Sequence, residues 1–542
     1  MDRIFFNGVV LTGDAQSPRV EAVAVREGSI AAVGGNDQIT SLRESSTEMV
    51  DLGGRLMLPG FNDSHLHLIG YATNRSKVDL SRCKSIDEVI EQIKEFIQRN
   101  QVPDGEWIFG WGWNHSLFKE KKMPDRRDLD RASTTHSLAM MRTCCHLLAV
   151  NTRALEKAGI DRNPPTLEGG KVETDSSGLS TGLLKEKAMS LVLDLIPPLD
   201  VDALKDLILA AGRDFCASGL TSVQTDDLAA LGSDLLPQLV EAYRLLEAEE
   251  TLPLRINLQP LLMKMAELER FIEMGYHEYA GSDFFKIGPL KLLSDGSLGG
   301  KTAFLNSPYE GEDSNRGVPV LSREEISALV NLAHKNGMQV ASHAIGDASI
   351  EMVLETYREA NRLYPRADPR FRVVHASVTS PKALEMFGEL GALADIQPSF
   401  TASDHAYIDQ NLGPERATWS YRWKDFIKKG IVMGGGSDCP VESFKPLSGI
   451  AVAVTRQDQN GEPAGGWFPE QRLDLGEALS IYTMGSAYCT FEERIKGSIS
   501  PGKLADLVVT AEDITAVDPF EIKDVEIAMT IVNGRVVYDS GE

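Results

Sequence analysis

Short apolar runs alternate with longer segments of helical periodicity through most of the chain. In segments such as 323–337 and 380–391, apolar residues recur three and four positions apart, which is the spacing of one helix face. This alternation is typical of βα units around a parallel sheet and predicts an α/β fold, a (β/α)₈ TIM barrel over residues 58–485. The expected barrel strands lie in residues 55–65, 219–226, 254–260, 284–296, 338–344, 371–377, 392–399 and 431–438.

Two stretches of short strands separated by Gly, Asn and Asp turns bracket this barrel, residues 1–57 and 486–542. If they pair, they form one small composite β-sandwich from both termini. The gap between the first two barrel strands, at about 70–215, is far too long for one βα connection and predicts an inserted subdomain. Strand-like runs at 106–113 and 137–145 support that prediction.

The charge balance narrows the function classes. The formal net charge is −24 and the sequence has no run of Lys and Arg residues that would form a basic patch. This charge disfavours nucleic acid or an anionic membrane as a partner. We find neither a signal peptide nor an apolar run of roughly 18 to 20 residues that could span a membrane. The six cysteines are scattered without CxxC spacing, so a disulfide framework is not expected. We expect a cytoplasmic enzyme, with a homodimer as the default assembly.

The strongest chemical signal is a pair of histidines at the end of the first predicted barrel strand. His65 and His67 are two positions apart, so an extended backbone projects both rings to the same side. Two imidazole nitrogens can then bind one metal ion, such as zinc. The alternative is that two exposed histidines alternate on a strand and bind nothing.

Three more ligand-type residues close later predicted strands. His343, His375 and Asp438 end the fifth, sixth and eighth strands, at the face where barrel enzymes place their chemistry. Taken singly, each histidine could be a buried core residue with its hydrogen bonds satisfied. Together with His65 and His67, these residues predict a metal centre.

Lys291 lies near the end of the fourth predicted strand, where an ammonium group among apolar residues costs desolvation energy. Carboxylation by CO₂ would make it an anionic oxygen ligand that can bridge two divalent metals. Alternatively, its ammonium pairs with Asp295 or points outward. Lys286 is the competing lysine, but it lies nearer the strand start and farther from the catalytic rim.

These residues match a known pattern: HxH after the first barrel strand, Lys after the fourth, His after the fifth and sixth, and Asp after the eighth. The chain resembles the amidohydrolase superfamily, and more narrowly the amidohydrolase family 3 branch that contains N-substituted formamide deformylases. The similar stretches are 110–118, 144–160, 168–184, 291–303, 342–347, 418–426, 434–447 and 497–509. The resemblance implies metal-ligand roles for His65, His67, Lys291, His343, His375 and Asp438. It also implies the terminal sandwich and the insertion.

The insertion is expected to supply substrate contacts. Trp111 and Trp113 are predicted to share one strand face and to behave alike, shaping an apolar pocket or else the insertion's own core. His146 is a predicted substrate contact, with a structural histidine beside two cysteines as the alternative. His115 is a further predicted contact at a position where relatives are expected to have an amide or acidic residue. Relatives more often have Gly before the counterpart of His146. These two differences bear on substrate identity.

The predicted reaction is hydrolysis of a carbon–nitrogen bond in a small-molecule amide, with N-formyl amides among the candidates. One or two Zn²⁺ ions, or other divalent metals, would lower the pKa of a bound water from about 16 toward 7. Asp438 would be both ligand and proton shuttle, and His375 would bind metal or polarise the carbonyl. The alternatives are a deaminase or cyclic-amide hydrolase on the same scaffold, and a catalytically silent binding or assembly protein.

Overall fold

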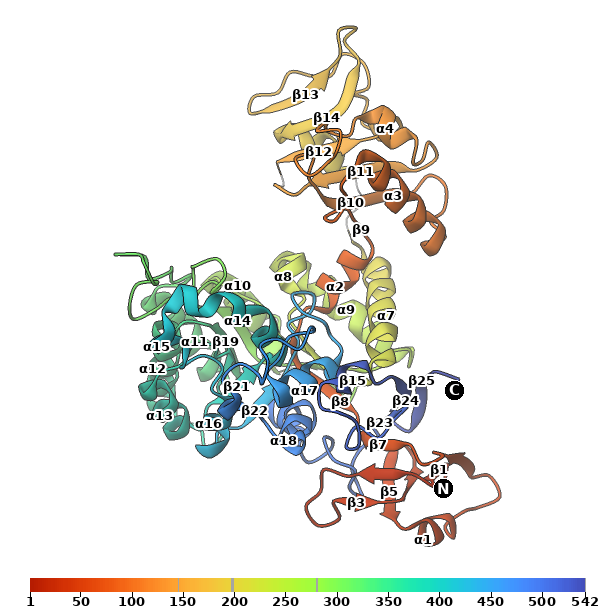
Figure 1. Cartoon of the computed structure of the whole chain (residues 1–542), viewed down its shortest axis with the longest axis vertical. Coiled ribbons are helices and arrows are strands. Elements are labelled where there is room, and N and C mark those ends of the chain that lie inside the picture. The colour runs from red at the N-terminus through yellow and green to blue at the C-terminus, as the bar shows by residue number, and fades with distance from the viewer. Residues whose placement is uncertain (145, 196–198, 279–280, 542) are drawn as a thin grey trace. The chain divides into compact units, whose positions relative to one another are not determined.

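Two units make up the chain in the computed structural model, which describes residues 1–144, 146–195, 199–278 and 281–541. The first unit joins Met1–Tyr71 to Val201–Glu542, and the second is the insertion Ala72–Asp200 (Figure 1). The predicted insertion, 70–215, was therefore too long at its C-terminal end. Helix α7 (Val201–Ala217) belongs to the first unit, where its last turn meets the terminal strands: Thr530 Oγ1 donates to Cys216 O at 2.7 Å.

Parallel strands form the core of the first unit in two sheets, ordered β17-β16-β15-β8 and β18-β19-β20-β21-β22. Helices separate most of these strands along the chain, so the α/β prediction is confirmed. The strands are β8 (Phe61–Leu66), β15 (Leu220–Thr225), β16 (Arg255–Leu258), β17 (Phe285–Ile287), β18 (Leu290–Leu293), β19 (Val340–Ala344), β20 (Arg372–His375), β21 (Leu393–Ile396) and β22 (Met433–Gly435). The main helices are α7, α9 (Leu236–Ala248), α10 (Met265–Glu273), α11 (Arg323–Lys335), α12 (Asp347–Leu363), α13 (Pro381–Leu390), α14 (Pro398–Leu412) and α17 (Pro446–Thr455).

Backbone hydrogen bonds connect both edges of these two sheets. On one side Lys291 N donates to Pro260 O at 2.9 Å, which ties β18 to the end of β16. On the other side Asp438 N donates to His65 O at 2.8 Å, which ties the end of β22 to β8. The strand order is therefore the one that the predicted barrel requires.

Two of the predicted barrel strands are each split in two. The first divides at Gly60 into β7 (Leu56–Pro59) and β8, and a Cβ on Gly60 would lie only 2.3 Å from the Thr221 side chain. The fourth divides at Gly288 and Pro289 into β17 and β18. Proline lacks the N–H that a continuous ladder needs, which explains the second break.

Both termini contribute to one mixed sheet, ordered β25-β24-β23-β7-β2-β3, and a second sheet, β5-β4-β1-β6, comes from the N-terminal strands (Figure 1). The two sheets share an apolar core that includes Phe5, Val23, Leu507 and Ile531. The C-terminal contribution starts later than the predicted residue 486: helix α19 (Ser486–Cys489) packs against the parallel strands, with Cys489 Sγ 3.4 Å from Asp395 Oδ1. These strands are β1 (Arg3–Phe6), β2 (Val9–Leu11), β3 (Arg19–Val20), β4 (Ala22–Arg26), β5 (Ser29–Gly34), β6 (Glu48–Asp51), β23 (Leu507–Thr510), β24 (Ile527–Val532) and β25 (Arg535–Asp539).

A buried ion network links the parallel strands to the segment that leads into the terminal strands. The carboxylate of Glu492 lies 2.6 Å from Lys286 Nζ and 2.7 Å from Lys496 Nζ, and Lys496 also donates to Ser222 Oγ. Lys286, the competing lysine for the metal centre, is thus engaged in an ion pair. Burial alone would raise the pKa of Glu492, but the charges and hydrogen bonds of Lys496 and Lys286 lower it to about 2.

This lowered pKa predicts an acid-dependent loss of stability. The stabilisation from ionised Glu492 is complete above its ordinary pKa of 4.5 and disappears as pH falls toward 2, amounting to about 3 kcal/mol. A Glu492→Gln variant should therefore be less stable than the wild type near neutral pH by about that amount. The difference should narrow between pH 4.5 and 2, which urea unfolding across that range measures. A constant difference would contradict the role assigned to this carboxylate.

The second unit is a six-stranded sheet ordered β13-β14-β12-β11-β10-β9. Helices α3 (Ile86–Asn100), α4 (Arg126–Asp130) and α5 (Thr152–Lys157) accompany β9 (Val78–Asp79), β10 (Trp107–Trp113), β11 (Ser137–Arg142), β12 (Leu147–Val150), β13 (Gly170–Thr174) and β14 (Ser180–Glu186). Across the described parts of both units, none of the helices combines the length and the apolar character that a membrane crossing demands.

Candidate metal centre

The six predicted metal-site residues lie in the parallel strands of the first unit or follow them within three residues. His65 lies in β8 and His67 follows it, while Lys291, His343 and His375 lie in β18, β19 and β20. Asp438 follows β22. His65, Lys291, His375 and Asp438 are buried, and His67 and His343 are partly buried. The site therefore sits at the carboxyl ends of the strands, where parallel strands gather functional side chains.

Three of these side chains form a tight group. Oδ1 of Asp438 lies 3.4 Å from His65 Nε2 and 3.0 Å from His67 Nε2. One ligand atom from each of the three residues falls within 4.8 Å of the others. Two imidazole nitrogens and a carboxylate oxygen at this spacing suit a divalent metal such as zinc.

The other three predicted residues adjoin this group. Lys291 Nζ is 3.4 Å from His65 Nε2. The ring of His375 lies 5.9 Å from that of His65 and 4.5 Å from that of His343, centroid to centroid. All six predicted residues therefore lie close together, with His375 between His65 and His343.

Backbone carbonyls fix the orientation of two histidine rings. His67 Nδ1 lies 2.8 Å from Asp226 O, and His343 Nε2 lies 3.1 Å from Gly296 O. A carbonyl oxygen only accepts, so each of these nitrogens carries a proton. The opposite nitrogen of each ring, Nε2 of His67 and Nδ1 of His343, is then the atom available to a metal.

Burial and charge set the protonation of the group. Burial lowers the pKa of Lys291 and lowers that of His65 to about 3, favouring the neutral forms. Burial would also lower the pKa of His67, but its hydrogen bond to Asp438 and the nearby carboxylates raise it to about 9. Burial would raise the pKa of Asp438, yet the adjacent imidazoles of His65 and His67 hold it well below its usual range. Asp438 is therefore an anionic acceptor.

Backbone strain marks two of the six residues. His375 has φ of +77° and Asp438 has φ of +57°, a region that residues other than glycine seldom adopt. Such conformations persist where surrounding contacts hold them, and they cluster at functional sites.

Asp295 does not pair with Lys291, which was the alternative for that lysine. Its carboxylate accepts backbone N–H groups from Phe304, Ile345 and Gly346, and Oδ1 lies 3.3 Å from His343 Nε2. It therefore ties the loop after β18 to the loop after β19, beside His343.

Sequence reasoning missed three neighbours of the site. Asp226, Gln259 and Gln397 each come directly after a strand, respectively β15, β16 and β21. The signal that could have found them is this shared register, because a polar residue one position beyond a parallel strand lies at the same edge as the ligands.

A family model described as "Amidohydrolase family" matches residues 48–538. The chain belongs to the amidohydrolase family. It is 35% identical over 540 residues to YtcJ of Bacillus subtilis, covering 99% of this chain and all of that one. It is 26% identical to the N-substituted formamide deformylase of Arthrobacter pascens, covering 99% and 98% of the two chains. Among solved structures, an uncharacterized metal-dependent hydrolase from Pyrococcus horikoshii superposes with a TM-score of 0.76 at 27% identity, over 95% of this chain and 99% of that one.

The two tryptophans predicted to behave alike in this amidohydrolase lie in different environments. Trp113 is fully buried in the core of the second unit, with Nε1 donating to Met140 O at 2.8 Å, whereas Trp111 is 42% exposed. Gly112 between them has φ of +94°, and the pairing of β10 with β11 shifts register there. This bulge breaks the alternation on which the prediction relied, and the prediction that Trp111 and Trp113 share one face and behave alike was wrong.

A matched pair of variants tests this difference. Trp113→Ala should destabilise the second unit by about 3 to 5 kcal/mol, because it leaves a cavity and removes the donor to Met140 O. Trp111→Ala should change the unfolding free energy by no more than about 0.5 kcal/mol. Denaturant unfolding of both variants measures the contrast, and equal losses would be inconsistent with the bulge.

The two predicted histidine contacts of the insertion lie near the same end of its sheet. His115 follows β10 and its Nδ1 lies 3.4 Å from Arg142 Nε. His146 precedes β12, is exposed, and pairs with Glu186 at 3.0 Å. Their roles toward a substrate remain predictions.

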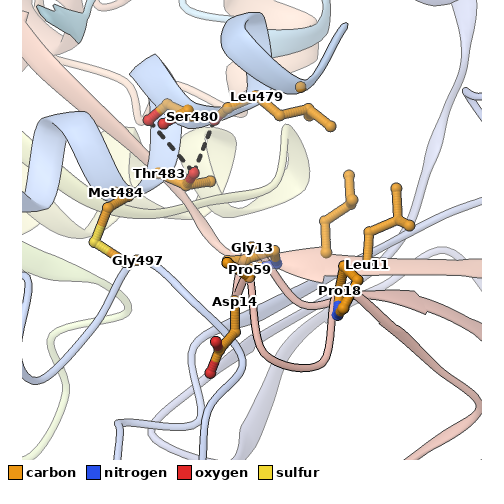
Figure 2. Close-up of a pocket in the computed structure, with 13 residues that line it drawn as sticks. Leu11, Gly13, Asp14, Pro18, Pro59, Leu479, Ser480, Thr483, Met484 and Gly497 are labelled. Atoms are coloured by element: carbon orange, nitrogen blue, oxygen red, sulfur yellow. Dashed lines mark hydrogen bonds between the residues drawn. The ribbon is translucent and has the colours of Figure 1, made fainter. Parts of the chain in front are cut away.

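The cavity in Figure 2 is separate from the candidate metal centre. It encloses about 380 Å³ between the N-terminal strands and the segment 476–484, and Pro59, the last residue of β7, lines it. His65 lies near the end of the next strand, β8, on the order of 15 to 20 Å away at the usual rise per residue. The other residues that line this cavity include Leu11, Asp14, Pro18, Leu479, Thr483 and Met484.

Proposed function

We propose that this amidohydrolase is a metal-dependent enzyme that hydrolyses the carbon–nitrogen bond of a small-molecule amide, with N-formyl amides as the first candidates. The observation that carries the proposal is the convergence of four histidines, Lys291 and Asp438 at the carboxyl ends of the strands. The similarity to an N-substituted formamide deformylase supports the choice of bond. We further propose that the two parallel sheets close into the eight-stranded barrel.

The side chains fit a zinc centre of one or two ions. The group of His65, His67 and Asp438 offers nitrogen and oxygen ligands from buried or partly buried side chains, a donor set that zinc accepts. His343 and His375 would hold a second ion. Lys291 would bridge the two ions as a carbamate, since burial lowers the pKa of its amine and favours the neutral form that reacts with CO₂.

When bound, the metal supplies a water whose pKa is lowered to about 7, and hence a hydroxide nucleophile at neutral pH. Asp438 accepts the proton that is lost as the amide carbon is attacked. It then delivers this proton to the leaving amine, so that the carbon–nitrogen bond breaks to give an amine and a carboxylate. Oδ1 of Asp438 contacts both His65 and His67, which places the proton shuttle at the metal ligands.

We assign substrate contacts to Trp111, His115 and His146 of the second unit, and we leave out Trp113 because its side chain is fully buried. A cytoplasmic homodimer without nucleic-acid or membrane partners stays part of the proposal. Trp111 is the contact that the geometry favours most, because a half-exposed indole offers apolar surface to an acyl or amine group.

Metal removal tests the function. We expect zinc in the purified protein, loss of amide hydrolysis on treatment with a chelator, and recovery when Zn²⁺ is added. A panel of N-formyl, N-acyl and cyclic amides, together with amino-substituted heterocycles, separates amide hydrolysis from ring opening and deamination. Metal binding without turnover of any compound would favour a silent binding protein.

A further inference from the structure

Two buried glutamines, each directly after a parallel strand, form hydrogen bonds with the Nδ1 atoms of two of the histidines. Gln259 directly follows β16 and Gln397 directly follows β21. Oε1 of Gln259 lies 2.9 Å from His65 Nδ1, and Oε1 of Gln397 lies 2.7 Å from His375 Nδ1. Unlike a backbone carbonyl, an amide side chain can present either oxygen or nitrogen, so its orientation decides where the histidine proton lies.

The second hydrogen bond of each glutamine decides that orientation. Nε2 of Gln259 donates to Ser64 O at 3.1 Å, and Nε2 of Gln397 donates to Asp395 O at 3.3 Å. Because a carbonyl oxygen only accepts, the NH₂ group must face it, and Oε1 must face the imidazole. Oε1 also only accepts, so the proton of each imidazole lies on Nδ1.

We propose that Gln397 is a positioning residue that holds His375 as the Nδ1-protonated tautomer, with the Nε2 lone pair turned toward the site. A neutral imidazole in this form can ligate a metal or accept a hydrogen bond through Nε2, but it cannot donate one to a substrate carbonyl. This hydrogen bond between His375 Nδ1 and Gln397 Oε1, here called the clamp, thereby excludes the carbonyl-polarising role that the sequence left open for His375. Only the use of the lone pair rests on the proposed function.

The surroundings of His375 keep its ring in this orientation. Phe400 stacks on it at 5.7 Å between centroids and 9° between planes. The rings of His65 and His343 lie against it at 5.9 and 4.5 Å. Turning the ring to exchange its two nitrogens would sacrifice the bond to Gln397 inside this packed setting.

Nitrogen NMR of the metal-free protein with ¹⁵N-labelled histidine tests the proposal directly. Long-range proton–nitrogen spectra should give His375, identified through a His375→Asn variant, a protonated Nδ1 and an unprotonated Nε2. Gln397→Leu should shift His375 toward a mixture of tautomers. Gln397→Glu, which keeps the acceptor, should retain the Nδ1 proton.

Gln259→Leu is the matched control, since it should alter the signals of His65 and leave those of His375 unchanged. A wild-type His375 protonated on Nε2 would overturn the proposal, as would an unchanged tautomer in folded Gln397→Leu protein. The wild-type spectrum decides the first point even if that variant does not fold.

Zinc affinity provides a second test of the role of Gln397. Loss of the clamp should weaken Zn²⁺ binding by about 10- to 100-fold, measured by competition with a chelator, whereas unchanged affinity would contradict an Nε2 ligand. If the protein hydrolysed no amide, the proposed function would be wrong, but NMR would still determine the tautomer of His375. Failure of the proposed function and failure of the tautomer assignment are therefore distinguishable.

Discussion

An Asp438→Asn variant is expected to lose about 10²- to 10⁴-fold in kcat while keeping its fold. The amide oxygen can occupy the place of Oδ1 near His65 and His67, but an amide cannot take up the proton of the attacking water. The backbone should tolerate the change, because asparagine adopts the left-handed conformation of this position, φ of +57°, more readily than most residues. Steady-state hydrolysis of the best amide from the substrate panel measures the loss.

Asp409→Asn provides the control for this variant. Asp409 is an exposed carboxylate in α14, and removing its charge should leave both kcat and the thermal midpoint unchanged. If Asp438→Asn retained wild-type activity with bound metal, the proton-shuttle mechanism would be wrong.

Lys291→Met should lower the bound zinc from about two ions per chain to about one in protein prepared with bicarbonate. A carbamate at Lys291 would supply the bridging oxygen, and a thioether cannot replace it. Activity should fall by at least about 100-fold, because a metal ion contributes several kcal/mol of transition-state stabilisation. Metal analysis and kinetics on the same preparation measure both effects.

Lys286→Met is the control for the lysine assignment. Lys286 pairs with Glu492, so its loss should reduce stability and leave the zinc content unchanged. Two zinc ions retained in Lys291→Met would mean that Lys291 bridges no metals.

Much of the metal centre could be predicted from the sequence because its residues follow from strand periodicity. His65 and His67 are two positions apart, and His343, His375 and Asp438 end or follow separate parallel strands. The carboxyl ends of such strands meet at one edge of a sheet, so a correct list of strands was enough to place these side chains together.

Features that depend on single backbone angles could not be predicted in this way. Strict alternation placed Trp111 and Trp113 on one face, whereas the positive φ of Gly112 separates them. The clamps by Gln259 and Gln397 were missed for another reason: their contacts join residues 194 and 22 positions apart, and a lone glutamine after a strand has no spacing pattern that marks it.

The pairing of β7 with β23 imposes an order on the biosynthesis of this protein. Leu56 pairs with Thr510, and Gly60, one residue before β8, donates its N–H to Asp506 O at 2.9 Å. At a translation rate of roughly 5 to 20 residues per second, the roughly 450 intervening residues take about 20 to 90 seconds to emerge. One edge of β7 therefore stays unpaired until the final segment has left the ribosome, whereas β8, which bears His65, pairs with β15. A chain that ended before β23 would keep the pairing of β7 with β2 but would lack the strand on the other edge of β7, so the composite sheet could not be completed.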